Sequence, residues 1–146
     1  MGKRYVNQKN SRTEEQRRIM EQIAQDGVCP FCIKHLKKYH KKPIILKGRW
    51  WHVTENMFPY EGSRLHILFI YKKHITSIPE VAQPAMYELF QLIKATIKKY
   101  DIEVGTLLWR FGDTKYNGSS VHHLHVQLIV GDVNKPNHKP IRVKIG

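Results

Sequence analysis

The chain has 146 residues, of which 41% are hydrophobic and 25% charged, a composition typical of one globular domain rather than of a disordered chain. Its 25 Lys and Arg residues against 12 Asp and Glu give a formal net charge of +13, which indicates anionic partners such as phosphates, nucleotides or nucleic acid. No apolar run approaches the ~18 residues of a membrane span, and the basic N-terminus leads into no signal core, so we expect a cytoplasmic protein without a membrane partner.

The first predicted elements are an arm and a helix. Residues 1–10 show no hydrophobic periodicity, which indicates a flexible basic arm, and the domain is then expected over residues 11–146. Ser11 or Thr13 can cap a helix, Thr13 and Gln16 have the spacing of a capping box, and Gly27 is a suitable helix stop. A helix is therefore expected from one of these two caps to Gly27.

Two cysteines follow this helix in Cys29-Pro30-Phe31-Cys32. Their spacing suits a metal ion or a redox pair better than a long structural disulfide. A tetrahedral zinc ion would need two further ligands, for which His35 and His40 are close in sequence. The alternative of two reduced cysteines that bind no metal also stays open. The lysines after the pair recur at helical spacing until Pro43, and they predict a short helix with a basic face.

The rest of the chain predicts a sheet and a long helix. Residues 51–54 alternate in polarity, and residues 65–71 form an apolar run of strand length. A helix is expected from Pro84 to Tyr100, followed by strands over 106–110 and 121–130 that a Gly-, Asn- and Ser-rich loop joins. This order predicts an α+β fold, in which helices pack on a small and mostly antiparallel sheet.

The most informative stretch is the strand predicted over 121–130. Side chains alternate between the faces of a strand, so His123, His125 and Gln127 share one face while the intervening apolar residues face the core. Imidazole can act as a nucleophile or as an acid and base near neutral pH. The preceding Gly118-Ser119-Ser120 offers backbone N–H groups and hydroxyls to an anion. The pattern therefore predicts a polar face suited to catalysis beside an anion-binding loop, and a face that is merely exposed to solvent stays the alternative.

The segment His123-Leu124-His125-Val126-Gln127-Leu128-Ile129 resembles the signature of the histidine triad (HIT) superfamily of nucleotide hydrolases and transferases, His-φ-His-φ-His/Gln-φ-φ with φ apolar. The likeness extends to Asn56–Tyr60 and His66–His74, which are similar to the family's nucleotide-binding turn, strand and "PKxH" segment. The cysteine pair is similar to that of the zinc-bearing branch. These motifs cover residues 28–131. The resemblance implies a single HIT-like domain with an antiparallel sheet and packed helices, and a homodimer.

The resemblance also implies roles for individual residues. His125 would be the nucleophile that attacks the α-phosphate and forms a nucleotidyl-histidine, and His123 would orient it. Ser120 and Gln127 would contact phosphate oxygens. The implied nucleotide-binding residues are Asn56, Phe58, Arg110, Asn117 and Ser119. The implied cofactor is a structural zinc ion, whose ligands would be Cys29, Cys32, His74 and His123.

The implied function is hydrolysis or nucleotidyl transfer at the α-phosphate of dinucleoside polyphosphates or of related nucleotides such as nucleoside phosphoramidates. Gln127 resembles the third position of the transferase and phosphorylase branches, so an acceptor other than water is also expected. Arg110, Lys115 and Lys72 would attract an anionic acceptor to the pocket mouth. Two other function classes stay open, namely a nucleic-acid-binding protein that removes adenylyl groups from DNA or RNA ends, and a nucleotide sensor with little turnover.

Overall fold

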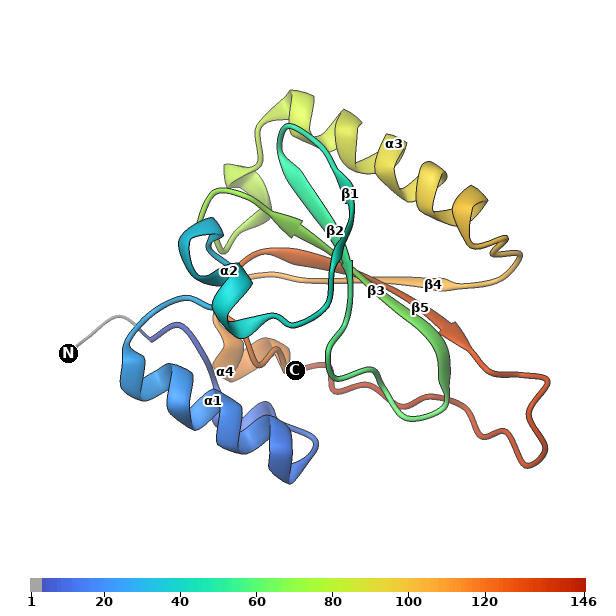
Figure 1. The fold of residues 1–146 in the computed structure, drawn as a ribbon, viewed down its shortest axis with the longest axis horizontal. Coiled ribbons are helices and arrows are strands. Elements are labelled where there is room, and N and C mark those ends of the chain that lie inside the picture. The colour runs from blue at the N-terminus through green and yellow to red at the C-terminus, as the bar shows by residue number, and fades with distance from the viewer. Residues whose placement is uncertain (1–3) are drawn as a thin grey trace.

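The computed structural model describes residues 4–146, which form five strands and four α-helices (Figure 1). The helices are α1 (Glu14–Asp26), α2 (Ile33–Tyr39), α3 (Gln83–Lys99) and α4 (Thr114–Asn117). The strands are β1 (Ile44–Lys47), β2 (Trp51–Glu55), β3 (Ser63–Tyr71), β4 (Thr106–Arg110) and β5 (His125–Gly131). Single 3₁₀ turns lie at Gln8–Asn10 and Ile78–Glu80. This is the α+β architecture of one domain that the sequence predicts.

The strands form one antiparallel sheet in the order β1-β2-β3-β5-β4. The sequence predicts four of these strands and misses β1. This strand has only four residues, directly after Pro43, and it pairs with β2 through a tight connection in which Lys47 lies opposite His52. A run this short does not show the alternation by which a strand is recognised from sequence.

The strand predicted over 121–130 begins only at His125. The residues before it leave the ladder, because the N–H of His122 donates to the carbonyl of Tyr5 at 2.8 Å and the N–H of Leu124 donates to that of Ile75 at 2.8 Å. His123 therefore precedes β5 and does not follow the alternation of side chains along this strand. Its ring can contact elements other than those beside His125 and Gln127.

The two faces of the sheet are covered by different helices (Figure 1). Helix α3 covers one face, where Ala85, Leu89 and Ile93 join the main core and the indole N–H of Trp51 donates to the carbonyl of Ala85 at 2.8 Å. The core includes Leu124, Val126 and Leu128, as the sequence predicts. Helix α2 packs on the other face, where Leu36 meets Leu68 and Ile70. The face of β5 that carries His125 and Gln127 is thus the face that α3 leaves uncovered.

Residues 4–10 pack on the domain and do not form the predicted arm, while residues 1–3 lie outside the described part of the chain. Val6 is 3% exposed, pairs with Val121 in an antiparallel bridge and joins Met20 and Ile23 of α1 in a small apolar cluster. The N–H of Asn7 donates to the carbonyl of Ser120 at 2.8 Å. A single buried valine in a polar segment shows no periodicity, so the sequence gives no sign of this contact.

Of the two caps predicted for α1 the structure has Thr13, and the predicted end at Gly27 is confirmed. The Thr13 hydroxyl accepts from the N–H of Gln16 at 3.0 Å, and Gly27 adopts the left-handed conformation at φ 65° that ends many helices. The Gln16 side chain accepts from the N–H of Arg12 rather than from that of Thr13. This bond fixes the segment before the helix against its first turn.

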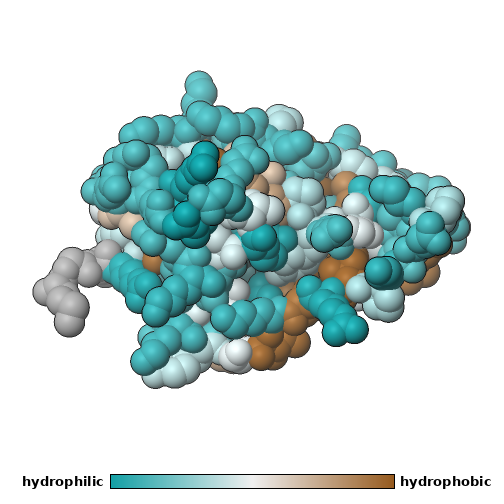
Figure 2. Space-filling model, turned by 90° about the horizontal axis from the view of Figure 1, so that it is seen from below, coloured by the Kyte–Doolittle hydropathy of each residue, from teal (hydrophilic) through white to brown (hydrophobic). Residues whose placement is uncertain are grey.

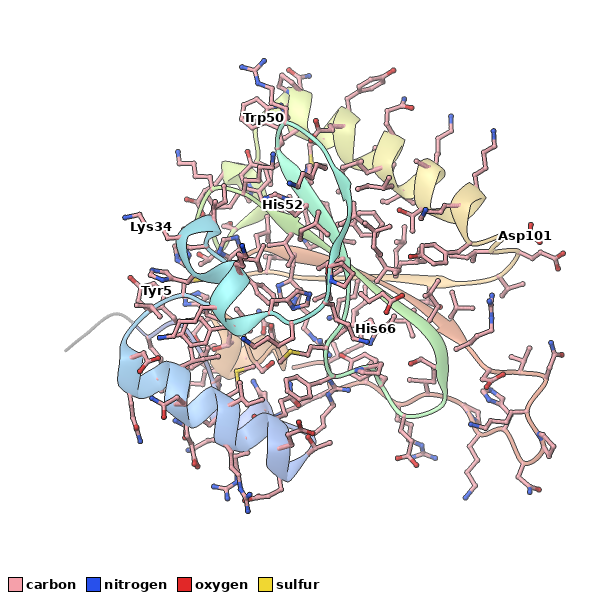
Figure 3. All side chains as sticks on the ribbon, in the orientation of Figure 1. Tyr5, Lys34, Trp50, His52, His66 and Asp101 are labelled. Atoms are coloured by element: carbon pink, nitrogen blue, oxygen red, sulfur yellow. The ribbon has the colours of Figure 1, made fainter. Side chains whose placement is uncertain are left out.

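The surface reflects the basic composition. The face seen from the side of α1 is mostly hydrophilic, with separate hydrophobic patches (Figure 2). The lysines of α2 are exposed, and Lys34 projects away from the sheet (Figure 3). Among residues 4–146, no helix combines the length and the apolar character that crossing a membrane requires.

Candidate functional site

A cavity of about 380 Å³ lies on the face of the sheet that carries His125. Its walls come from the segment before α1, the loop after β2, the loop before β5 and the C-terminal residues 142–144. Seven of the residues that the sequence proposes for catalysis or nucleotide binding line this cavity, namely Asn56, Phe58, Arg110, Ser119, Ser120, His125 and Gln127. Residues far apart in the chain thus meet around one space large enough for a nucleotide.

His125 lies at the base of this cavity with a fixed ring orientation. Its Nδ1 lies 2.6 Å from the backbone carbonyl of His123, and a carbonyl can only accept, so Nδ1 carries the proton. Nε2 is then the nitrogen with a free lone pair. Burial lowers the pKa of His125 to about 4, although the bond to the His123 carbonyl opposes this shift. The ring is therefore neutral at physiological pH, which is the form that can act as a nucleophile.

Gln127 is oriented by a chain of hydrogen bonds that begins at the backbone. The N–H of Tyr60 donates to Nδ1 of His66 at 3.1 Å, so the proton of this imidazole is on Nε2. Nε2 lies 2.8 Å from Oε1 of Gln127 and donates to it (His66 is labelled in Figure 3). The amide group of Gln127 consequently keeps its NH₂ donors for the cavity, where they can bind a phosphate oxygen.

His66 has no role in the predictions from sequence, although the sequence carries a signal for it. It is the one histidine within the apolar run 65–71, and it lies on the same side of β3 as Leu68, which is opposite Gln127 in the sheet register. Burial lowers its pKa to about 4, so the neutral form that orients Gln127 persists at physiological pH.

The loop before β5 holds the two serines differently. The Ser119 hydroxyl donates to the carbonyl of Val121 at 3.0 Å. Ser120 accepts from the side-chain amide of Gln16 at 3.4 Å, which leaves its own proton for a ligand in the cavity. Asn117 does not line the cavity, because its amide donates to the carbonyl of Phe111 at 2.9 Å and its oxygen accepts from the N–H of Ser119. Its side chain therefore stabilises the loop before β5.

The four predicted metal ligands form one cluster, and their ligand atoms all lie within 4.8 Å of one another. Nδ1 of His123 lies 3.3 Å from Sγ of Cys29, 3.8 Å from Sγ of Cys32 and 3.2 Å from Nδ1 of His74. Zn–S bonds of about 2.3 Å and Zn–N bonds of about 2.0–2.1 Å place the ligand atoms of a tetrahedral ion roughly 3.3–3.8 Å apart. The cluster therefore has the size of a tetrahedral metal site.

The protonation of the cluster also fits a cation. Nε2 of His123 lies 2.5 Å from the carbonyl of Tyr71 and must donate to it, so Nδ1 turns its lone pair toward the sulfur atoms. Burial raises the pKa of Cys29 to about 12, so a thiolate there needs a positive charge beside it. A two-cysteine, two-histidine donor set is one that zinc prefers.

The other two histidines near the cysteines are not part of the cluster. His40 is buried, and its Nε2 lies 2.8 Å from the Thr54 hydroxyl. His35 is half-buried on α2 and is absent from the cluster within residues 4–146. Of the alternatives that the sequence leaves open, the structure thus favours His74 and His123.

Phe31 connects the cysteine cluster to the cavity. It lies between the two cysteines in sequence and lines the cavity, and its ring meets that of His125 edge-on with centroids 5.2 Å apart. It also meets the ring of His123 at 6.2 Å. A metal that holds the Cys29–Cys32 loop would therefore also hold the apolar ring that covers His125.

The cations at the cavity differ from those that the sequence proposes. Arg110 lines the cavity, but Lys72 and Lys115 do not. Lys72 donates to the carbonyl of Gly48 on the β1–β2 connection. The other basic residues at the cavity come from both ends of the described chain, namely Lys9, Arg12, Arg142 and Lys144. They lie outside the motifs of residues 28–131, so the motifs could not indicate them.

Comparison of the sequence with known proteins finds a distant relative but no family. No protein-family model matches the chain. An uncharacterized protein of Archaeoglobus fulgidus is 26% identical over 117 residues, which are 73% of this chain and 34% of that protein. The chain thus spans about a third of the length of the curated relative that it matches.

Solved structures with the same fold are histidine triad proteins. A histidine triad nucleotide-binding protein from Candida albicans superposes with a TM-score of 0.60 at 16% identity, over 80% of this chain and 86% of that one. A HIT-like protein gives 0.56 at 23% identity, over 68% and 95%. The diadenosine triphosphate hydrolase of Plasmodium falciparum gives 0.52 at 16% identity, over 66% and 65%. The chain therefore has the histidine triad fold.

Proposed function

We propose that this chain, which has the histidine triad fold, is a nucleotide hydrolase or nucleotidyltransferase that acts at the α-phosphate of dinucleoside polyphosphates or related nucleotides. The observation that carries the proposal is the fixed tautomer of His125, whose Nε2 lone pair faces the cavity because Nδ1 is bonded to the His123 carbonyl. The diadenosine triphosphate hydrolase with the same fold supports the substrate class.

The proposed reaction has two displacements. Nε2 of His125 attacks the α-phosphorus, the new N–P bond forms, and the bond to the bridging oxygen, or to the nitrogen of a phosphoramidate, breaks as the leaving group departs with its electron pair. Water or another acceptor then attacks the same phosphorus, the N–P electron pair returns to His125, and an attacking water loses its proton to the solvent. In this scheme the NH₂ of Gln127 and the hydroxyl of Ser120 bind the phosphate oxygens. Asn56 and Phe58 lie on the loop that would receive the nucleoside.

Zinc is the metal that we propose for the cluster of cysteines and histidines. Bound there, it would supply a structural tie between the loop after α1 and the segment before β5. The reacting groups remain His125, Gln127 and Ser120 of the chain itself. A direct test of the function is a panel of diadenosine tetraphosphate, adenosine phosphoramidate and a 5′-adenylylated oligonucleotide, with products identified by mass. Turnover of the first is expected, and failure of all three to turn over would contradict the proposal.

Gln127 leads to a prediction about the acceptor. An amide holds a phosphate oxygen without titrating near pH 7, so it cannot supply the base that water needs, whereas inorganic phosphate is already anionic. We expect added phosphate to raise turnover and to appear in the product. Gln127→His should shift the product a few-fold toward hydrolysis, because one ring nitrogen can accept from His66 while the other faces the cavity.

The measurement is oxygen-labelled water incorporated into mononucleotide, with and without phosphate. Gln22→His is the control, since Gln22 is exposed on α1 and does not line the cavity. Label in all of the mononucleotide formed by the unaltered protein, whatever the phosphate concentration, would show that water is the acceptor.

We also propose a homodimer that joins two copies along β4. This strand is at one edge of the sheet, and Leu107 is 49% exposed on it while Phe111, directly after it, is 56% exposed. An uncovered edge with apolar side chains is suited to pairing with a second copy. Leu107→Asp is expected to convert the dimer to a monomer in light scattering. The control Val133→Asp, at a residue 69% exposed beyond β5, should not. A monomeric unaltered protein would contradict the proposal.

A further inference from the structure

Two arginines from distant parts of the chain meet at one tyrosine on the cavity wall. Arg12 precedes α1, and its guanidinium carbon lies 4.2 Å from the centroid of the Tyr60 ring. Arg110 ends β4, and its Nη1 donates to the Tyr60 hydroxyl at 3.0 Å. Tyr60 is only 8% exposed, so it can hold both guanidinium groups in place.

No carboxylate balances these two charges in the described chain. Within residues 4–146, neither arginine forms an ion pair, and no Asp or Glu lines the cavity. Lys9, Arg142 and Lys144 add further positive charge to the same walls. Partial desolvation lowers the pKa of Arg12, the interaction with Tyr60 opposes this shift, and the charge of Arg110 adds to it. Like charges that are held together without a counter-ion favour the binding of an anion.

Both guanidinium groups keep donors for such an anion. Arg12 donates through Nη2 to the carbonyl of Phe58 at 2.5 Å. Arg110 donates through Nε and Nη2 to the carbonyl of Lys144, at 3.2 and 2.6 Å, in addition to its bond to Tyr60. A guanidinium has five N–H groups, so these bonds leave four on Arg12 and two on Arg110 within residues 4–146. The neutral carbonyls that the two arginines already bind are also weaker hydrogen-bond acceptors than charged phosphate oxygens, so a phosphate can compete with them.

The arginine pair lies beside the proposed nucleophile. Arg110 is opposite His125 in the register of β4 and β5, and both residues line the cavity. When a nucleotidyl group moves to His125, negative charge develops on the leaving group. A cationic pair in the same cavity stabilises that charge if the leaving group reaches it.

We infer that Arg12 and Arg110, held by Tyr60, form a binding site for the phosphate chain of the leaving group. This inference rests on the proposed function and adds a selectivity to it. Nucleotides whose leaving group carries phosphates are preferred over those whose leaving group is an uncharged amine. Arg12 is the informative residue, because it comes from the segment before α1, outside the motifs that resemble the family.

The first test compares two substrates with the same adenylyl group. Arg12→Gln should reduce the ratio of kcat/KM for diadenosine tetraphosphate to that for adenosine phosphoramidate by about 10- to 100-fold, as expected for the loss of a charge-assisted hydrogen-bond partner. Arg12→Lys keeps the charge without the planar donor array and should give a smaller reduction. Arg18→Gln is the matched control, since Arg18 is 75% exposed on α1 and should leave the ratio unchanged.

An equal loss for both substrates in Arg12→Gln would show that Arg12 only supports the loop at Phe58, and it would overturn the inference. The second test does not depend on turnover. Inorganic pyrophosphate should bind the unaltered protein and Arg18→Gln in calorimetry, more weakly as salt increases, and Arg12→Gln should weaken this binding at least about tenfold. Unchanged binding in Arg12→Gln would overturn the inference. If Arg12 governs pyrophosphate binding but no nucleotide turns over, the anion site stands and the proposed function fails.

Discussion

Replacement of His125 by Ala is expected to lower nucleotide turnover by roughly 10³-fold or more, because the covalent route through a nucleotidyl-histidine is lost. Nucleotide affinity should change little, since most of the cavity wall comes from the loops around Asn56 and Ser119 and from both ends of the described chain. The measurement is steady-state turnover together with nucleotide binding by calorimetry. His122→Ala is the matched control, because His122 precedes the strand, does not line the main cavity and contacts the carbonyl of Arg4.

The same prediction can be tested on the intermediate itself. Rapid quenching with substrate labelled in the α-phosphate should give an acid-labile adduct, and peptide mapping should place it on His125. The bond from Nδ1 to the His123 carbonyl requires attachment at Nε2. An adduct on His123, or an unchanged rate in His125→Ala, would contradict the assignment. A burst of adduct without continued turnover would favour the alternative of a nucleotide sensor.

The parts of the site that could be predicted from the sequence are those that depend on local pattern. Alternation along a strand predicts that Leu124, Val126 and Leu128 enter the core, and the structure confirms this. The resemblance to the histidine triad family implied which residues would meet, although Cys29 and His123 are separated by 94 positions. Cys29, Cys32, His74 and His123 do lie within 4.8 Å as that resemblance implied.

The parts that could not be predicted depend on contacts that leave no pattern. Val6 pairs with Val121, and this contact brings the segment before α1 to the cavity. The side-chain amide of Asn10 also donates to the carbonyl of Ser119, and Arg12 and Gln16, which follow in the chain, line the cavity. In sequence they are polar residues at a helix start, where their usual role is capping or solvation. Lys144 also could not be predicted, because it contributes its backbone carbonyl, which accepts from Arg110 at the cavity wall.

The role of His66 could be predicted only in part. A histidine within an apolar strand is unusual and can be recognised in the sequence, but its role follows only from its hydrogen-bond partners. Because Tyr60 donates to Nδ1, Nε2 must donate to Gln127, and the orientation of the amide is determined. A sequence indicates that such a polar residue needs a partner, and the register of β3 against β5 decides which partner it finds.

The second large effect is expected at the metal site. Cys29→Ser should abolish binding of about one zinc ion per chain and lower the melting temperature by roughly 10 °C or more, because the binding free energy of a structural zinc contributes to folding. Metal content is measured by mass spectrometry of protein purified without chelator, and stability by thermal unfolding. His35→Ala is the matched control, since His35 follows the same cysteine pair but lies outside the cluster.

The physical reason for a large effect is the set of elements that the ligands connect. Cys29 and Cys32 precede α2, His74 follows β3, and His123 precedes β5 and is fixed by its bond to Tyr71. Without the ion, the coordination bonds that join these elements are lost, and their binding free energy no longer contributes to folding. Loss of the metal should also loosen Phe31 against His125, so turnover should fall together with stability. Zinc that persists in His74→Ala but is lost in His35→Ala would show that the ligand set is wrong, and protein without any bound metal would contradict the site altogether.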